Sequence, residues 1–110
     1  MMLVDEIIAT LRLNTNALGV WLLGPMVIAN NQYQNDVLAA AVENSSIKPP
    51  LNAVVTSETQ LDFEDRGIYA MPIGPAILVV VFDEQSSMGL IRLRVRHVMK
   101  AIEAALAART

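Results

Sequence analysis

Few side chains in this 110-residue sequence could carry chemistry. There is no cysteine, which excludes disulfides, thiolate nucleophiles and cysteine metal sites. The single histidine, His97, excludes a multi-histidine metal centre and leaves little acid–base capacity near neutral pH. Helical spacing places His97 on an apolar arc beside Ala101, so we expect it to be a packed or interfacial side chain rather than a base or ligand.

The carboxylates and hydroxyls do not form a recognisable reactive group. Asp62, Glu64 and Asp65 cluster before a predicted turn, which is typical of a solvated turn, a metal site being the less favoured alternative. Ser57 and Ser86 have no visible base to activate them. The sequence contains neither a P-loop nor a dinucleotide-binding fingerprint. We therefore predict no cofactor, no metal and no enzymatic activity.

Composition favours an interaction domain that shares its surface with partners. Apolar residues make up 54% of the chain and charged residues only 17%, so part of the surface must be apolar or covered by another molecule. The net charge of −3 argues against a nucleic-acid partner, since such proteins are usually basic. The length fits one domain over residues 1–110 with a core of its own.

Two apolar stretches raise the question of a membrane. Ala17–Ala29 and Ile68–Phe82 are both shorter than the roughly 20 residues that a spanning helix needs, and both contain Gly-Pro breaks. The first charges are Asp5 and Glu6, whereas a signal peptide begins with positive charge. We expect a cytoplasmic protein without membrane insertion.

Hydrophobic spacing and turn residues predict an α+β fold with the order αββαβββα. It is a five-stranded antiparallel sheet with helices packed on it, and Ile77–Phe82, apolar on both faces, belongs in mid-sheet. Trp21, within an apolar strand, is predicted to be core. The elements are a helix from Leu3 that ends at Asn14–Asn16, strands Ala17–Leu23 and Met26–Ala29 around Gly24-Pro25, a helix Asp36–Ser45 capped by Asp36 or Asn35, a strand Asn52–Phe63, a turn Asp65–Gly67, strands Ile68–Ile73 and Ala76–Phe82 around Gly74-Pro75, and a helix Met88–Ala108 capped by Ser86 or Ser87.

The last predicted helix is apolar over most of its circumference. It therefore needs two neighbours, the sheet and either the first helix or a second copy of the protein. Ala101, Ala104 and Ala108 would allow close approach, unless they serve simply as good helix formers. The first 85 residues carry a net charge of −7 and the last 25 carry +4. We interpret the polar strip of the last helix, which carries Arg92, Arg96 and Lys100, as a solvated face. Arg94 falls between the two apolar arcs of this helix, and we expect it to pair with a carboxylate.

The segment Asp83–Arg96 resembles roadblock-type domains, the family that includes a dynein light chain and bacterial partners of Ras-like GTPases. In that family an apolar strand ending in Asp is followed by a small polar pair, an apolar residue, Gly and a Leu/Arg-rich helix, as in Asp83-Glu84-Gln85-Ser86-Ser87-Met88-Gly89-Leu90 here. Pro72-Ile73-Gly74 before the last strand fits as well. The element order matches over nearly the whole chain.

The resemblance implies a roadblock/profilin-like fold and a homodimer joined through sheet edges and helices. The third strands would pair edge to edge along Asn52–Thr59, closing an edge that is otherwise an aggregation risk, with the middle helices side by side. The implied dimer-interface residues are Asn52, Val54, Val55, Thr56, Ser57, Ala39 and Ala40. The implied contacts with a further partner are Tyr33, Asn35, Glu43, Arg92 and Arg96.

By the same resemblance, the function expected is that of a non-enzymatic regulator or scaffold for a small Ras-like GTPase. Members of the bacterial branch of the family can speed GTP hydrolysis by reshaping the GTPase's own site. The alternative is a dimeric ligand-sensing or adaptor module in signalling, which predicts a pocket between sheet and helix. A small enzyme is the least favoured reading, because no nucleophile, base and orienting residue come together in the sequence.

Overall fold

The computed structural model describes residues 3–24, 27–32, 57–62, 66–83 and 87–108, with the backbone alone for Val27, Gln32, Leu61 and Asp62. The predicted middle helix, Asp36–Ser45, lies outside these residues. The described elements, in chain order, are α1 (Val4–Thr15), β1 (Gly19–Leu23), β2 (Val27–Gln32), β3 (Thr59–Asp62), β4 (Arg66–Ile73), β5 (Ala76–Asp83) and α4 (Met88–Ala108).

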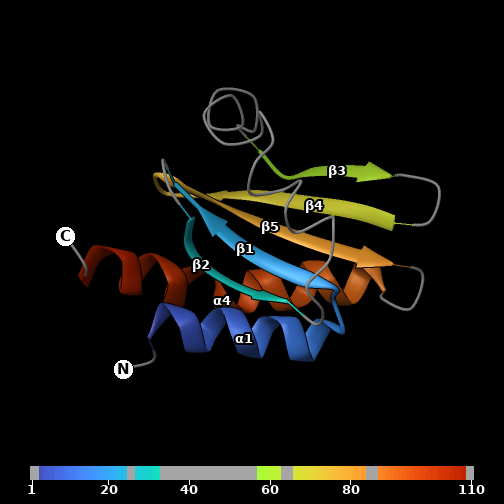
Figure 1. The fold of residues 1–110 in the computed structure, drawn as a ribbon. Coiled ribbons are helices and arrows are strands. Elements are labelled where there is room, and N and C mark those ends of the chain that lie inside the picture. Colours follow the sequence, from blue (N-terminus) through green and yellow to red (C-terminus); the bar gives the residue numbers. More distant parts are fainter. Residues whose placement is uncertain (1–2, 25–26, 33–56, 63–65, 84–86, 109–110) are drawn as a thin grey trace.

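The five strands form one antiparallel sheet in the order β2-β1-β5-β4-β3, as predicted (Figure 1). β5 occupies the centre because its side chains are apolar on both faces, and seven of its eight residues are buried. It pairs with β4 through a tight hairpin at Gly74, whose φ of 59° is a left-handed conformation that glycine adopts without strain. β2 and β3 lie at the two edges.

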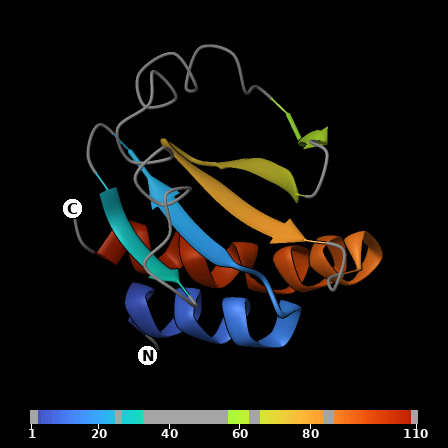
Figure 2. The ribbon, with the colours of Figure 1, turned by 45° about the vertical axis from the view of Figure 1, so that its right-hand side comes forward.

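Both described helices lie on one face of the sheet, side by side and antiparallel (Figure 2). Between them and the sheet lies the larger core cluster, which includes Ile8, Leu11, Leu78 and Ile91. A smaller cluster around Trp21 and Val79 occupies the opposite face, and Trp21 is buried as predicted. The neighbour that α4 needed besides the sheet is therefore α1.

The ends of the helices follow from their residue types. At the start of α1 the Glu6 carboxylate accepts a hydrogen bond of 3.4 Å from the Leu3 backbone N–H, and acidic residues favour this end of the helix dipole. Asn16 ends α1 in a left-handed conformation with φ of 56°. At the start of α4 the Ser87 hydroxyl accepts a 3.4 Å hydrogen bond from the Leu90 backbone N–H, so Ser87 is the capping serine.

None of the described helices is both long and apolar enough to cross a membrane.

Three predicted boundaries were wrong. β2 continues through Asn30 to Gln32, because an edge strand tolerates polar side chains, and Asn31 accepts a hydrogen bond from Arg12 of α1. Arg66 and Gly67 belong to β4 and not to a turn. In the described residues the third strand begins only at Thr59, since the Thr59 hydroxyl donates a 3.0 Å hydrogen bond to the Ser57 carbonyl, a local bond that competes with strand pairing.

Gly67 explains why β4 extends further than predicted. It pairs with Phe82 of β5, and the aromatic ring lies over the position that a Cβ on residue 67 would occupy. The glycine therefore provides the space for the ring, as happens where an aromatic side chain covers a strand glycine.

We predict that Gly67→Ala lowers the free energy of unfolding by about 1–3 kcal/mol, because the added methyl forces the Phe82 ring out of its place. Gly89→Ala is the matched control. Gly89 is exposed near the start of α4, and its nearest neighbour to a new Cβ is the Ser87 hydroxyl at 3.8 Å. This variant should gain about 0.5 kcal/mol. Urea denaturation of both variants tests the pair, and equal effects would contradict the account.

Candidate functional site

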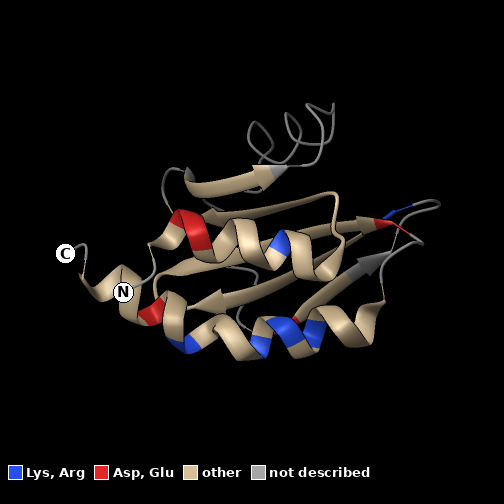
Figure 3. Cartoon of the chain, turned by 90° about the horizontal axis from the view of Figure 1, so that it is seen from below, with Lys and Arg blue, Asp and Glu red and all other residues tan. Residues whose placement is uncertain are grey.

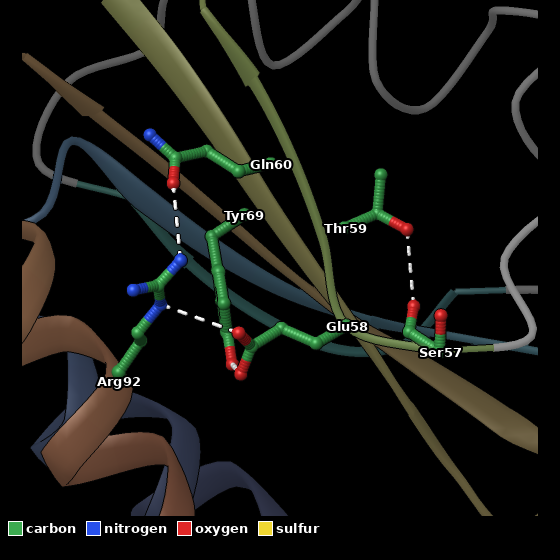
Figure 4. Close-up of polar contacts among 6 residues, drawn as sticks. All are labelled: Ser57, Glu58, Thr59, Gln60, Tyr69 and Arg92. Carbon is green, nitrogen blue, oxygen red and sulfur yellow. Dashed lines mark hydrogen bonds and ion pairs between the residues drawn. The ribbon is translucent and has the colours of Figure 1, made fainter.

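A polar cluster joins the β3 edge to the first half of α4, on the helix-covered side of the sheet (Figure 4). Tyr69 lies in the middle of β4 and is fully buried. It pairs with Gln60 of β3, and Glu58 lies just before that strand. Arg92 reaches these residues from α4. The cluster therefore connects the edge strand, its neighbour and the helix layer.

The Tyr69 hydroxyl donates a 2.6 Å hydrogen bond to Glu58 Oε2. Burial raises the pKa of Tyr69 well above its ordinary value of 10.0, and the hydrogen bond and charge of Glu58 add to the shift. The positive charges of Arg92 and Arg96 act in the opposite direction without cancelling it. Tyr69 is therefore a neutral hydrogen-bond donor at physiological pH and not an acid or a base.

Arg92 holds the other side of the same carboxylate. Its Nε lies 3.3 Å from Glu58 Oε1, and its Nη2 donates a 3.4 Å hydrogen bond to Gln60 Oε1. The Arg92 side chain is 44% exposed and that of Glu58 30%, so the ion pair alone contributes less than about 1 kcal/mol. The main effect of the pair is on position. Both oxygens of Glu58 are engaged, so the residues that lead into β3 are held against α4.

Only three of the residues proposed from the sequence as interface or partner contacts lie within the described residues. Ser57 is exposed two residues before β3, and Arg92 and Arg96 are exposed one turn apart on α4. Ser57 and Arg92 thus lie at the same junction between β3 and α4, and their roles as interface and partner contacts stay predictions. Outside the described residues lie Asn52, Val54, Val55, Thr56, Ala39, Ala40, Tyr33, Asn35 and Glu43.

Two expectations concern α4 itself. Arg94 has no carboxylate partner among the described residues, and its Nε is buried there without a hydrogen-bond acceptor, so its pairing with a carboxylate stays a prediction. His97 is exposed in the single chain, which leaves the interfacial alternative of its prediction. Among the residues that the structure describes, no three acidic or histidine side chains are placed to hold a metal ion.

The sequence analysis missed Glu58 and Tyr69. The only sign of them was a tyrosine within the apolar run Ile68–Met71 and a single charge between Ser57 and Thr59. A buried tyrosine hydroxyl needs a hydrogen-bond acceptor, so Tyr69 could have been predicted to have a polar partner. Its partner could not be chosen, because several carboxylates precede β4.

The fold is similar to those of several solved structures. MglB of Myxococcus xanthus superimposes with a TM-score of 0.74 at 20% identity, over 94% of each chain. A roadblock/LC7 domain from Streptomyces avermitilis gives 0.71 at 12% identity, covering 96% of this chain and 99% of the other. Profilin IB of Acanthamoeba castellanii gives 0.57 at 17% identity, over 91% and 96%. No protein-family model matches the sequence, and neither does any curated protein.

These similarities confirm two predictions from the sequence. The chain has the fold of a roadblock-type domain, and its class is the α+β roadblock/profilin-like fold with a five-stranded antiparallel sheet. All three identities lie at 20% or below, so the similarity establishes the fold and leaves partner and activity to be argued from the molecule.

The cluster predicts how stability depends on pH. Because the folded-state pKa of Tyr69 is raised, its contribution is complete below about pH 10 and is lost as pH rises toward the folded-state value, by at most about 1.4 kcal/mol per pH unit. Tyr69→Phe should remove this part of the alkaline loss and cost about 1.5 kcal/mol at pH 7, the value of a hydrogen bond to a charged group. Chemical denaturation from pH 7 to 11 tests both, and parallel curves for the two proteins would contradict the assignment.

Proposed function

We propose that this chain is a non-enzymatic regulator or scaffold that binds a small Ras-like GTPase as a homodimer. The observation that carries the proposal is the location of β3 at the sheet edge, beside the basic first half of α4, in a roadblock-type fold. The sequence resemblance over Asp83–Arg96 is what implies the GTPase.

The β3 edge supports pairing between two copies. β4 is the one strand that the structure pairs with β3 among the described residues, so the other side of β3 faces away from the sheet. Pairing through this side would extend the sheet across a two-fold axis and bury the edge. The contacts from Glu58 to Tyr69 and Arg92 hold the chain that leads into β3, which reduces the entropy lost on pairing.

Arg92 fits a positioning role better than a catalytic one. Its guanidinium is already engaged with Glu58 and Gln60, and releasing it would leave the Glu58 carboxylate without its cation. We therefore assign regulation to the way the dimer surface shapes the GTPase and not to a residue inserted into the nucleotide site. Arg96 is a second exposed cation one turn further along α4.

The alternative, a ligand-sensing or adaptor module, requires space between sheet and helices. In the described part of the chain this region is filled by side chains that are almost completely buried, among them Leu11, Leu22 and Ile91. This packing favours a protein partner over a small ligand at that position.

Affinity capture tests the function. Immobilised protein is exposed to extract of the cells that express it, with GDP in one sample and a non-hydrolysable GTP analogue in the other, and retained proteins are identified by mass spectrometry. We expect a Ras-sized GTPase in one nucleotide state, with capture weakened by Glu43→Arg and unaffected by Asp5→Asn, a charge change at the start of α1. Retention in both states would indicate a scaffold, and the absence of a GTPase from both samples would contradict the proposal.

The edge pairing has its own test. Val55→Asp, in the segment proposed to pair, is expected to give a monomer or a strongly destabilised protein, because it places a charge in a strand interface. Asn30→Asp introduces the same charge on β2, at the opposite edge, and should leave the dimer intact. Light scattering gives the masses. A Val55→Asp protein that stays dimeric and equally stable would exclude this edge.

A further inference from the structure

The outer surface of the helix layer, formed by α1 and α4, exposes large hydrophobic side chains among its charged ones. Leu3, Leu13 and Leu93 are the large hydrophobic side chains that the described residues leave exposed, and all three lie at the start of or within its two helices. Leu13 is 67% exposed and Leu93 49%. Leu13 lies on the side of α1 opposite the buried residues, and Leu93 does the same on α4.

On α4, Leu93 begins a stripe along the outward side. His97, Lys100 and Ala104 follow it at intervals of three or four residues, and all of them are exposed. Ala107 and Ala108 continue the exposed surface toward the end of the helix. A leucine at one end of the stripe and small residues at the other are complementary in shape when two such helices meet in opposite directions.

Most of the charges on this layer are separated along its length, the exception being Lys100, one turn from Glu103 (Figure 3). The acidic residues Asp5 and Glu6 lie in the first turn of α1, and Glu103 lies in the second half of α4. Because the helices are antiparallel, these three are toward the end where both termini lie (Figure 1). Arg92, Arg94 and Arg96 occupy the other end of α4.

The basic end is not explained by helix stability. The first turn of a helix favours negative charge, yet the first turn of α4 carries no acidic residue and three arginines follow it. Arg92 pairs with Glu58, whereas the exposed Arg96 forms no ion pair with another described residue. A cation in this position is favourable when an acidic group of another molecule lies against it.

We propose that the helix layer is an interface with a second copy of this chain, related by a two-fold axis that runs across the helices. Such an axis places the acidic end of one layer against the basic end of the other, so the surface is complementary to itself. An anionic membrane or a uniformly acidic protein would attract one end and repel the other. The separation of charge therefore favours a second copy over those occupants.

The same axis specifies the contacts along α4. With the two α4 helices antiparallel and the axis between Met99 and Lys100, Arg96 meets Glu103 of the second copy. Leu93 then packs on the small side chains around Ala104 of the second copy, and its exposed surface is covered. Lys100 lies beside the axis, from where its long side chain extends toward Glu103 of the second copy.

This interface is separate from the proposed β3 edge, since it uses the helix layer and not a strand. Where the edge contact and the helix-layer contact both form, the assembly contains four copies if the two two-fold axes generate a closed symmetry. It is a longer array if they do not. In Val55→Asp, where edge pairing is blocked, the helix layer should give only a weak self-association that appears as the protein concentration is raised, so dilute Val55→Asp protein is still expected to be monomeric. The two interfaces can thus fail independently.

A charge exchange tests the proposal by sedimentation equilibrium of the full chain. Arg96→Glu and Glu103→Arg should each weaken the helix-layer association about tenfold, because every substitution acts twice in a two-fold contact. The double variant Arg96→Glu/Glu103→Arg keeps the wild-type net charge and should restore the association. Circular dichroism checks that each variant is folded.

Leu93→Ser tests the apolar part of the contact without a change of charge, and should weaken the same association. Wild-type protein with no association beyond the edge-paired dimer would overturn the proposal, as would a double variant no better than the single ones. Vesicles containing phosphatidylserine serve as the competing occupant. Binding to them that is lost in Arg96→Glu, with self-association unchanged, would overturn it in favour of a lipid surface.

Discussion

The rest of the fold depends on a strand that cannot face water on either side. β5 is apolar from Ala76 to Phe82 and buried over that whole length, so it needs a strand on each side and cover on both faces. Fully burying one Val or Leu side chain contributes about 1.5–3 kcal/mol, which makes any arrangement with β5 at an edge unfavourable. Its antiparallel pairing with β4 through a two-residue turn, and with β1 on the other side, satisfies this requirement.

Placing β5 in the centre leaves the more polar strands at the edges, and each edge is tied to a helix by an arginine. At one edge Arg12 of α1 donates a hydrogen bond of 2.5 Å to Asn31 Oδ1 of β2. At the other, Arg92 of α4 meets Glu58 and Gln60 beside β3. These contacts contribute less to stability than the core does, but they determine how the edges are presented. The edge at β3 is the one on which the proposed dimer depends.

The sequence predicted what local chemistry controls and failed where the outcome depended on the assembled fold. The hairpin at Gly74, the cap at Ser87 and the central place of β5 follow from residue types within a few positions of one another. The hydrogen bond from Tyr69 to Glu58 joins residues eleven apart in the chain. The register between β3 and β4 determines that Glu58 is the acceptor for the Tyr69 hydroxyl. Gly67 was assigned to a turn from its residue type. Its actual role, which is to leave space for the Phe82 ring, exists only once β4 and β5 pair.

The central claim is that two copies of this chain present one surface to a single GTPase. Native mass spectrometry of the purified protein mixed with the captured GTPase tests it directly, with GDP and a GTP analogue in parallel. The account predicts a complex of two copies with one GTPase in one nucleotide state, and free components in the other. A complex of one copy with one GTPase, or no complex in either state, would contradict it.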